Sequence, residues 1–225
     1  MADGHPVNSA PPRGSPPVSD PSRPGPQTTR LVLVRHGQTD FNRQDRWQGS
    51  RSDEPLNEAG RDQIRSVAER LAAASGELAA LYTSDLVRAL ESAEILARRL
   101  GLSPRVDRGL REMDHGAFEG RTKAEAMALF PEVHAALEAD PARVRRPEGD
   151  SYDSLGERLW PTLGRIVDRH AGERVAVVAH GGPIRLVLSR ALERPLTERA
   201  AFGVTNGSWF VVEVAGDRWR VADSL

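Results

Sequence analysis

Residues 31–37 read Leu-Val-Leu-Val-Arg-His-Gly, and residues 175–182 read Val-Ala-Val-Val-Ala-His-Gly-Gly. In both stretches an uninterrupted apolar run stops abruptly at a histidine that is followed by glycine. Apolar runs of this kind are typical of strands buried on both faces of a parallel sheet. Open α/β sheets bind ligands beyond the carboxyl ends of such strands. The two stretches therefore predict an α/β layered domain with its functional side chains at the strand ends.

Helical and extended patterns alternate along the rest of the chain. Helical periodicity predicts helices over residues 57–74, 151–170 and 183–192, the second of them with a kink at Pro161. A cap at Ser84-Asp85 predicts a helix that ends at Gly101, and the capping box of Thr122 and Glu125 predicts the start of another. Strands are expected over residues 78–83, around Val106, and in a hairpin of residues 209–214 and 219–222. This alternation favours a layered α/β architecture.

The composition excludes several classes of protein. The chain has 225 residues and a formal net charge of −1, which lacks the basic excess of most nucleic-acid-binding proteins. It has no cysteine, so disulfides and thiolate metal sites are excluded. No apolar run is long enough for a membrane span or a secretory signal. We therefore expect a cytoplasmic protein that binds neither nucleic acid nor membranes.

The first 28 residues differ from the rest of the chain. They hold eight of the sixteen prolines and few apolar residues, so they cannot bury enough surface to offset the entropy of ordering. Residues 1–28 are predicted to be a disordered proline-rich tail, with a docking peptide for a partner as the alternative. Residues 29–225 are predicted to be one domain.

The strand-end residues suggest phosphate chemistry. An imidazole nitrogen can attack phosphorus when its ring is held in one tautomer, and an adjacent glycine lets a bulky anion approach the backbone. The guanidinium of Arg35 can orient phosphate oxygens. The competing interpretation is that His36 and His180 are packed in loops. Taken singly, Arg88 suits a surface ion pair and Glu112 a solvated turn.

Considered together, the motifs resemble those of the histidine phosphatase superfamily, also called phosphoglycerate mutase-like. The matching motifs, in chain order, are Arg35-His36-Gly37-Gln38-Thr39-x-x-Asn42, Gln48-Gly49, Pro55-Leu56-x-x-x-Gly60-x-x-Gln63, Ser84-Asp85-Leu86-x-Arg88-Ala89, Glu112 and His180-Gly181-Gly182. The resemblance covers the chain from about residue 30 to 192. It implies a three-layer αβα sandwich with a mostly parallel central sheet.

The resemblance also implies a role for each residue of the site. His36 would be the nucleophile that forms a phosphohistidine, and Glu112 would protonate the leaving oxygen and then activate water. The remaining residues would contact the phosphoryl group or the substrate: Arg35, Arg88 and His180, together with Asn42, Gln48, Gly49 and Gly181. No metal and no cofactor are implied, because arginines and histidines supply the positive field. Homodimers are common in the family.

Other polar residues are expected to lie outside the site. His115 is predicted to lie at the surface or in a loop, and His134 and His170 are predicted to face solvent. The basic cluster Arg143, Arg145 and Arg146 is predicted to be a solvated face, with substrate recognition as the alternative. Trp47 is expected either to wall the site or to pack in the core.

Within the family, the sequence favours a phosphatase over a mutase. Mutases have a longer segment after the acidic residue, which excludes water, whereas here about thirty residues separate Gly120 from Gly149. The expected substrate is a small phosphomonoester of the sugar phosphate or phosphoglycerate type. Residues 30–42, 46–49 and 206–209 are similar to actinobacterial glucosyl-3-phosphoglycerate phosphatases. α-Ribazole phosphatase, fructose-2,6-bisphosphatase, phosphoglycerate mutase and a non-catalytic phospho-ligand-binding protein are the alternatives.

Overall fold

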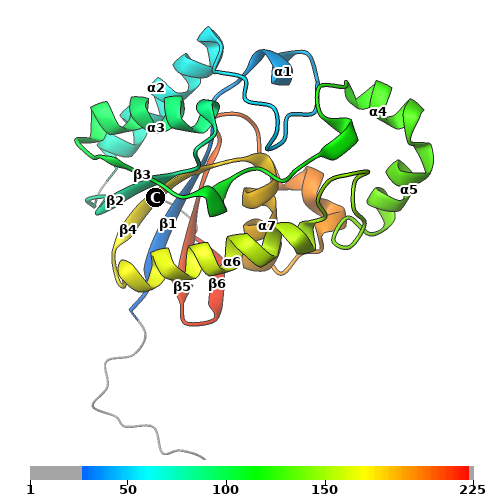
Figure 1. Cartoon of the computed structure of the whole chain (residues 1–225). Coiled ribbons are helices and arrows are strands. Elements are labelled where there is room, and N and C mark those ends of the chain that lie inside the picture. Colours follow the sequence, from blue (N-terminus) through cyan, green and yellow to red (C-terminus); the bar gives the residue numbers. More distant parts are fainter. Residues whose placement is uncertain (1–26, 75, 223–225) are drawn as a thin grey trace, which may run out of the picture.

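The computed structural model describes residues 27–74 and 76–222 (Figure 1). Nearly all of the predicted tail, residues 1–26, lies outside the described residues, so its disorder stays a prediction. The strands are β1 (Thr29–Arg35), β2 (Ala80–Thr83), β3 (Pro104–Val106), β4 (Arg174–Ala179), β5 (Trp209–Ala215) and β6 (Arg218–Val221). The helices are α1 (Asp40–Arg43), α2 (Glu58–Ala73), α3 (Val87–Leu100), α4 (Lys123–Leu129), α5 (Pro131–Ala139), α6 (Tyr152–Arg169) and α7 (Gly181–Ala191).

The strands form one sheet in the order β3-β2-β4-β1-β5-β6. β3, β2, β4 and β1 are parallel, whereas β5 runs antiparallel to both β1 and β6. The prediction of a mostly parallel central sheet is therefore confirmed. The predicted hairpin is β5 and β6, which turn at Gly216, a residue with a φ of 57°.

Helices cover both faces of the sheet, which confirms the three-layer sandwich (Figure 1). Alternate residues of the buried strands point to opposite faces. Leu31 and Leu33 of β1 pack in the core beneath α6 and α7, whereas Val32 and Val34 pack in the core beneath α2 and α3. The two apolar layers hold β1 and β4 in the middle of the molecule and so fix where their carboxyl ends lie.

A smaller lobe stands beside the carboxyl edge of the sheet and contains α4 and α5 (Figure 1). It has its own apolar cluster, in which Phe118, Ala126 and Leu137 are buried and Trp47 packs against them. The Thr122/Glu125 capping box is present at the start of α4, as predicted. Within the described residues, none of the helices combines the length and the apolar character that crossing a bilayer requires.

Two local predictions need correction. The helix after β2 begins at Val87 rather than at a cap on Ser84 or Asp85, because the backbone N–H of Val87 donates to Asp53 at 2.7 Å and the side chains of Ser84 and Asp85 bind other partners. The residue His170 is buried rather than exposed to solvent. Its ring nitrogens lie 2.6 Å from the carboxylate of Glu173 and 3.1 Å from the hydroxyl of Tyr82.

Candidate active site

The register of β1 against β4 brings the two strand-end histidines together. Arg35 pairs with Ala179 in this parallel ladder, so the next residues, His36 and His180, leave the sheet side by side. Their ring centroids are 5.1 Å apart, with an angle of 54° between the ring planes. Both side chains are buried. The sequence motifs at the two strand ends therefore form one site.

A single backbone contact orients the ring of His36. Its Nδ1 lies 2.7 Å from the carbonyl oxygen of Gly37. A carbonyl can only accept a hydrogen bond, so Nδ1 carries the proton and Nε2 keeps its lone pair. Burial lowers the pKa of His36 well below its usual value, and the charges of Arg88 and Arg35 lower it further. The ring is therefore neutral at pH 7, with Nε2 available as a nucleophile.

Two arginines supply positive charge beside this ring. Arg35 donates to the carbonyl of Val204 at 2.9 Å, and Arg88 donates to the carbonyls of Ser52 and Gly49, each at 2.9 Å. Burial lowers both arginine pKa values to about 10, so both remain charged at pH 7. Among the described residues neither Nε atom has a hydrogen-bond partner. Two guanidiniums, one buried and one half-buried, that are held by neutral carbonyls suit an anionic ligand.

Glu112 is held at the amino end of α7. Its carboxylate oxygens accept from the backbone N–H of Gly182 at 3.0 and 3.1 Å, and one of them accepts from the N–H of Met113 at 2.9 Å. A side chain at position 182 would place its Cβ 2.3 Å from Oε1 of Glu112, so any other residue there would force this carboxylate to move. The segment that carries Glu112 is held by Arg158, which donates to the carbonyls of Gly109, Arg111 and Glu112 at 3.0, 2.7 and 2.7 Å.

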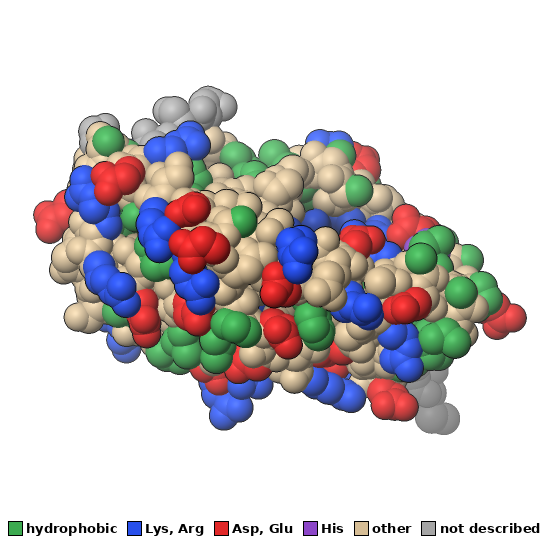
Figure 2. All heavy atoms as spheres, turned by 90° about the horizontal axis from the view of Figure 1, so that it is seen from above, with side chains coloured by type: hydrophobic (Ala, Val, Ile, Leu, Met, Phe, Trp, Pro, Cys, Tyr) green, Lys and Arg blue, Asp and Glu red, His purple; other side chains and the backbone are tan. Residues whose placement is uncertain are grey.

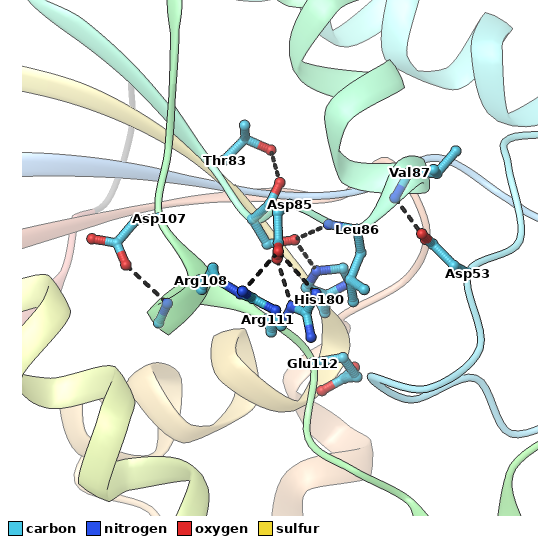
Figure 3. Close-up of polar contacts among 12 residues, drawn as sticks. Asp53, Thr83, Asp85, Leu86, Val87, Asp107, Arg108, Arg111, Glu112 and His180 are labelled. Atoms are coloured by element: carbon cyan, nitrogen blue, oxygen red, sulfur yellow. Dashed lines mark hydrogen bonds and ion pairs between the residues drawn. The ribbon is translucent and has the colours of Figure 1, made fainter.

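The loop between β2 and α3 connects these parts of the site (Figure 3). The hydroxyl of Ser84 lies 2.6 Å from Nε2 of His180. The next residue, Asp85, accepts two hydrogen bonds from Arg111, at 2.6 and 2.8 Å, which lower the pKa of its carboxyl. Because Arg111 directly precedes Glu112, the same short loop restrains both His180 and the acidic segment.

A polar cavity of about 250 Å³ opens at this edge. Residues that line it include Arg35, Asn42, Gln48, Glu112 and Gly181. The amide oxygen of Asn42 accepts from Asn206 at 2.9 Å and from the backbone N–H of Thr39 at 3.2 Å, so the NH₂ group of Asn42 is the part that can donate to a ligand. Gly49 is not among the lining residues; its carbonyl binds Arg88 instead.

Figure 2 looks onto this edge of the molecule, and the side chains of Lys and Arg lie within its hollow. Two cationic residues of the polar cavity were not expected from the sequence. Arg185 and Lys123 line the polar cavity, together with Asn206. The sequence did contain a signal for Arg185, because this residue lies one turn into the helix that follows His180. Arg88 has the equivalent place, in the first turn of the helix that follows the second strand. Lys123 is the first residue of α4, in the smaller lobe. No local pattern in the sequence indicated that this lobe lies beside the strand ends.

Three further expectations need correction. His115 lies in a loop, which is one of its expected placements, but it is neither at the surface nor outside the site: it is 6% exposed, lines the polar cavity, and packs edge-on against Trp47 with ring centroids 4.8 Å apart. Trp47 thus lines the site, which is one of its two expected roles. Within the basic cluster, Arg143 and Arg145 are exposed as predicted, whereas Arg146 is 6% exposed and its guanidinium lies 5.6 Å from the centre of the Trp47 ring system. His134 is half-buried rather than solvent-facing.

Comparison with known proteins agrees with this geometry. The sequence profile of the histidine phosphatase superfamily (branch 1) matches residues 31–224. Phosphoglycerate mutase-like protein 4 of Arabidopsis thaliana is 40% identical over 194 residues, which cover 85% of this chain and 82% of that protein. The metal-independent phosphoserine phosphatase of the same plant is 34% identical over 199 residues, covering 87% and 80% of the two chains.

Solved structures give the same assignment. The structure of mycobacterial glucosyl-3-phosphoglycerate phosphatase in complex with VO3 is 34% identical and has a TM-score of 0.75. The likeness covers 86% of this chain and 96% of that one. The fold, the strand-end motifs and the phosphatase relatives agree with one another. The chain is therefore an enzyme of the histidine phosphatase superfamily.

Proposed function

We propose that the protein is a cytoplasmic, metal-independent phosphomonoesterase that hydrolyses small phosphorylated metabolites through a phosphohistidine on His36. The observation that carries the proposal is the 2.7 Å contact between Nδ1 of His36 and the carbonyl of Gly37, beside the charges of Arg88 and Arg35. It leaves Nε2 of a neutral imidazole with a free lone pair, close to the two arginines that would hold a phosphoryl group. A nucleophile held in one tautomer and a preformed positive field are what phosphoryl transfer requires.

The first half of the reaction transfers the phosphoryl group to the enzyme. Nε2 of His36 attacks phosphorus and forms a P–N bond while the ester P–O bond breaks. The departing oxygen takes a proton from the carboxyl group of Glu112. Arg35 and Arg88 balance the charge on the phosphoryl oxygens. His180, whose Nδ1 is buried and has no hydrogen-bond partner among the described residues, donates to one of them.

The second half returns the enzyme to its starting state. The carboxylate of Glu112 now accepts a proton from a water molecule, whose oxygen attacks phosphorus as the P–N bond breaks. Inorganic phosphate leaves, and both His36 and Glu112 recover their starting protonation states. Asn42 and Gln48, which line the polar cavity, add hydrogen bonds to the phosphoryl group or to the substrate.

The test is release of inorganic phosphate from p-nitrophenyl phosphate in the presence of EDTA. We expect full activity in EDTA, loss of activity in His36→Ala, and an acid-labile, base-stable phosphoenzyme in the wild type only. Undiminished hydrolysis by the alanine variant, at an unchanged melting temperature, would exclude the phosphohistidine mechanism. Loss of wild-type activity in EDTA that added divalent metal restores would exclude metal independence.

Phosphoglycerate mutase activity is the second candidate, because the relative at 40% identity is named as mutase-like. A mutase would convert 3-phosphoglycerate to 2-phosphoglycerate, would depend on a bisphosphorylated primer, and would release little phosphate. A non-catalytic phospho-ligand-binding protein would form no phosphoenzyme. The grouping of His36, His180, Arg88 and Glu112 in one buried site favours an active enzyme over this third possibility.

A further inference from the structure

The turn that precedes β5 lies against the backbone around His36. Residues 205–208 form a β-turn, in which the N–H of the last residue donates to the carbonyl of the first at 3.0 Å. Its third residue, Gly207, has a φ of 70°, and its N–H lies 3.2 Å from the carbonyl oxygens of both Arg35 and His36. Its second residue, Asn206, is half-buried and lines the polar cavity. The turn therefore presents the side chain of Asn206 to the nucleophile.

The amide nitrogen of Asn206 donates to three oxygens of the site. Nδ2 lies 3.2 Å from the carbonyl oxygen of His36, 3.3 Å from that of Gly37, and 2.9 Å from the amide oxygen of Asn42. The carbonyl of Gly37 is the same one that lies 2.7 Å from Nδ1 of His36. One oxygen therefore receives both the ring of the proposed nucleophile and the amide of Asn206.

The direction of this carbonyl is not set by Gly37 itself. Glycine has no side chain to restrict its backbone, and a Cβ at position 37 would lie 2.3 Å from the carbonyl oxygen of Gly60. The peptide unit that contains the carbonyl is held at its two ends by other residues. Asn206 binds the oxygen, and Gln63 accepts from the N–H, which belongs to Gln38, at 2.9 Å.

The direction of the carbonyl decides which tautomer of His36 is present. With the carbonyl in place, Nδ1 carries the proton and Nε2 keeps its lone pair. With the carbonyl turned away, Nδ1 loses its acceptor and the proton is free to move to Nε2. Nε2 then has no lone pair with which to attack phosphorus.

Asn206 also determines which end of the Asn42 amide faces the polar cavity. The oxygen of Asn42 accepts from Asn206 at 2.9 Å and from the backbone N–H of Thr39 at 3.2 Å. Without the amide of Asn206, the side chain of Asn42 is free to turn and present its oxygen to the cavity. An oxygen in that position would repel a phosphoryl oxygen instead of donating to it.

We infer that Asn206 is a positioning residue, which sets the tautomer of His36 through the carbonyl of Gly37 and sets the orientation of Asn42. The inference rests on the proposed function, in which Nε2 of His36 attacks phosphorus. Asn206 acts through the backbone and through Asn42, without contact with the reacting atoms. The residue before β5 thus belongs to the machinery of a nucleophile that follows β1.

The first test measures the tautomer in the free protein. NMR of ¹⁵N-labelled histidine rings distinguishes a protonated ring nitrogen from an unprotonated one, and the signals of His36 are those that disappear in His36→Gln. At pH 7.5 we expect the Nδ1–H tautomer in the wild type and a clear population of the Nε2–H tautomer in Asn206→Leu, which has a similar shape but no donor. Asn206→Ala makes the same comparison with a smaller side chain.

Thr205→Ala is the matched control, because Thr205 lies in the same turn and is exposed. It is expected to keep the wild-type tautomer. The Nδ1–H tautomer alone in Asn206→Leu and Asn206→Ala, at melting temperatures near that of the wild type, would overturn the inference.

The second test separates the two effects by kinetics with p-nitrophenyl phosphate. We expect Asn206→Leu to lower kcat by about fivefold or more and to raise KM by about threefold. In an Asn42→Ala background the same substitution should still lower kcat but leave KM unchanged, because the orientation of Asn42 no longer matters. An equal rise in KM in both backgrounds, with kcat unaffected, would indicate direct contact between Asn206 and the substrate and would overturn the inference.

The two tests distinguish failure of the inference from failure of the proposed function. If the wild type hydrolyses no ester, the proposed function fails, whereas the tautomer measurement still decides whether Asn206 positions His36. If the wild type forms a phosphoenzyme but the tautomer does not depend on Asn206, the inference fails and the proposed function stands.

Discussion

Arg158, in α6, donates to the backbone carbonyl of Glu112 at 2.7 Å and to those of Arg111 and Gly109 at 2.7 and 3.0 Å. One guanidinium therefore holds three carbonyls of the segment that carries the proposed acid. It does not contact the carboxylate itself, so its effect on the reaction is to position Glu112.

The Arg158→Gln substitution should therefore impair protonation of the leaving group. Aryl phosphates have good leaving groups that need little protonation, whereas alkyl phosphates need it fully. We expect kcat to fall by about tenfold or more with glycerol 3-phosphate and by less than about threefold with p-nitrophenyl phosphate. Arg158→Lys should restore part of the loss. Arg169→Gln, on an exposed position of the same helix, serves as control; equal losses for both substrates would point to a merely structural effect.

Ser84→Ala removes the hydroxyl that lies 2.6 Å from Nε2 of His180. The imidazole is then left in a buried position with one fewer hydrogen bond, at a cost of about 1–3 kcal/mol. If His180 contacts the phosphoryl group in the transition state, kcat should fall by about tenfold while KM changes little. Steady-state kinetics checks this split, with Ser208→Ala, at a half-buried serine whose hydroxyl donates to Thr205, as control. A rise in KM at constant kcat would contradict this role for His180.

Gly182→Ala and Gly164→Ala form a matched pair. The added Cβ at position 182 would lie 2.3 Å from Oε1 of Glu112, whereas at position 164 it would meet nothing within 4 Å. We expect the first substitution to displace Glu112 and lower kcat by at least about tenfold. The second should leave activity intact and raise stability by about 0.5–1 kcal/mol, because alanine is favoured over glycine inside α6. Chemical denaturation measures the stability of the two variants, and phosphate release measures their activity. Wild-type activity in Gly182→Ala would count against Glu112 as the acid.

Stability should depend on pH through three buried histidines. Burial is the largest cause of the lowered pKa of His36, His115 and His180 in the folded protein. In the unfolded chain each titrates near pH 6.5, so below that pH the unfolded state binds more protons than the folded state. The contribution of these neutral histidines to the free energy of unfolding is therefore complete above about pH 6.5 and is lost as the pH falls below it.

Each of these histidines contributes a slope of up to about 1.4 kcal/mol per pH unit to the free energy of unfolding. Urea denaturation at pH 7.5, 6.5 and 5.5 measures the total, and His115→Gln should remove one histidine's share of the slope. A free energy of unfolding that is constant down to pH 5.5 would contradict the burial of neutral histidines.

The layered fold was predictable because β1 and β4 are continuous apolar runs and the surface helices have clear periodicity. The grouping of His36 and His180 followed from their common position at strand ends. His115 and Arg146 could not be placed in the same way. Their burial depends on how the lobe of α4 and α5 packs against Trp47, and no periodic pattern in residues 112–150 specifies that packing.

The side chains of Ser84 and Asp85 show a different limit of sequence reasoning. Both residue types favour helix caps, and the local pattern predicted one here. In the folded protein, Ser84 binds His180 and Asp85 binds Arg111, while Asp53, from a separate loop, supplies the cap of α3. Tertiary contacts with the site thus replaced the local preference.

The pairing of Arg35 with Ala179 in the β1–β4 ladder has a consequence for how the enzyme can change. A shift of either strand by a single residue would turn one imidazole toward the opposite face of the sheet. Insertions can accumulate in the connecting loops without harm to the two rings, whereas one residue gained or lost within either strand abolishes the pair. New specificities in this scaffold must therefore arise from the lobe and the loops, around an alignment of two strands that stays fixed.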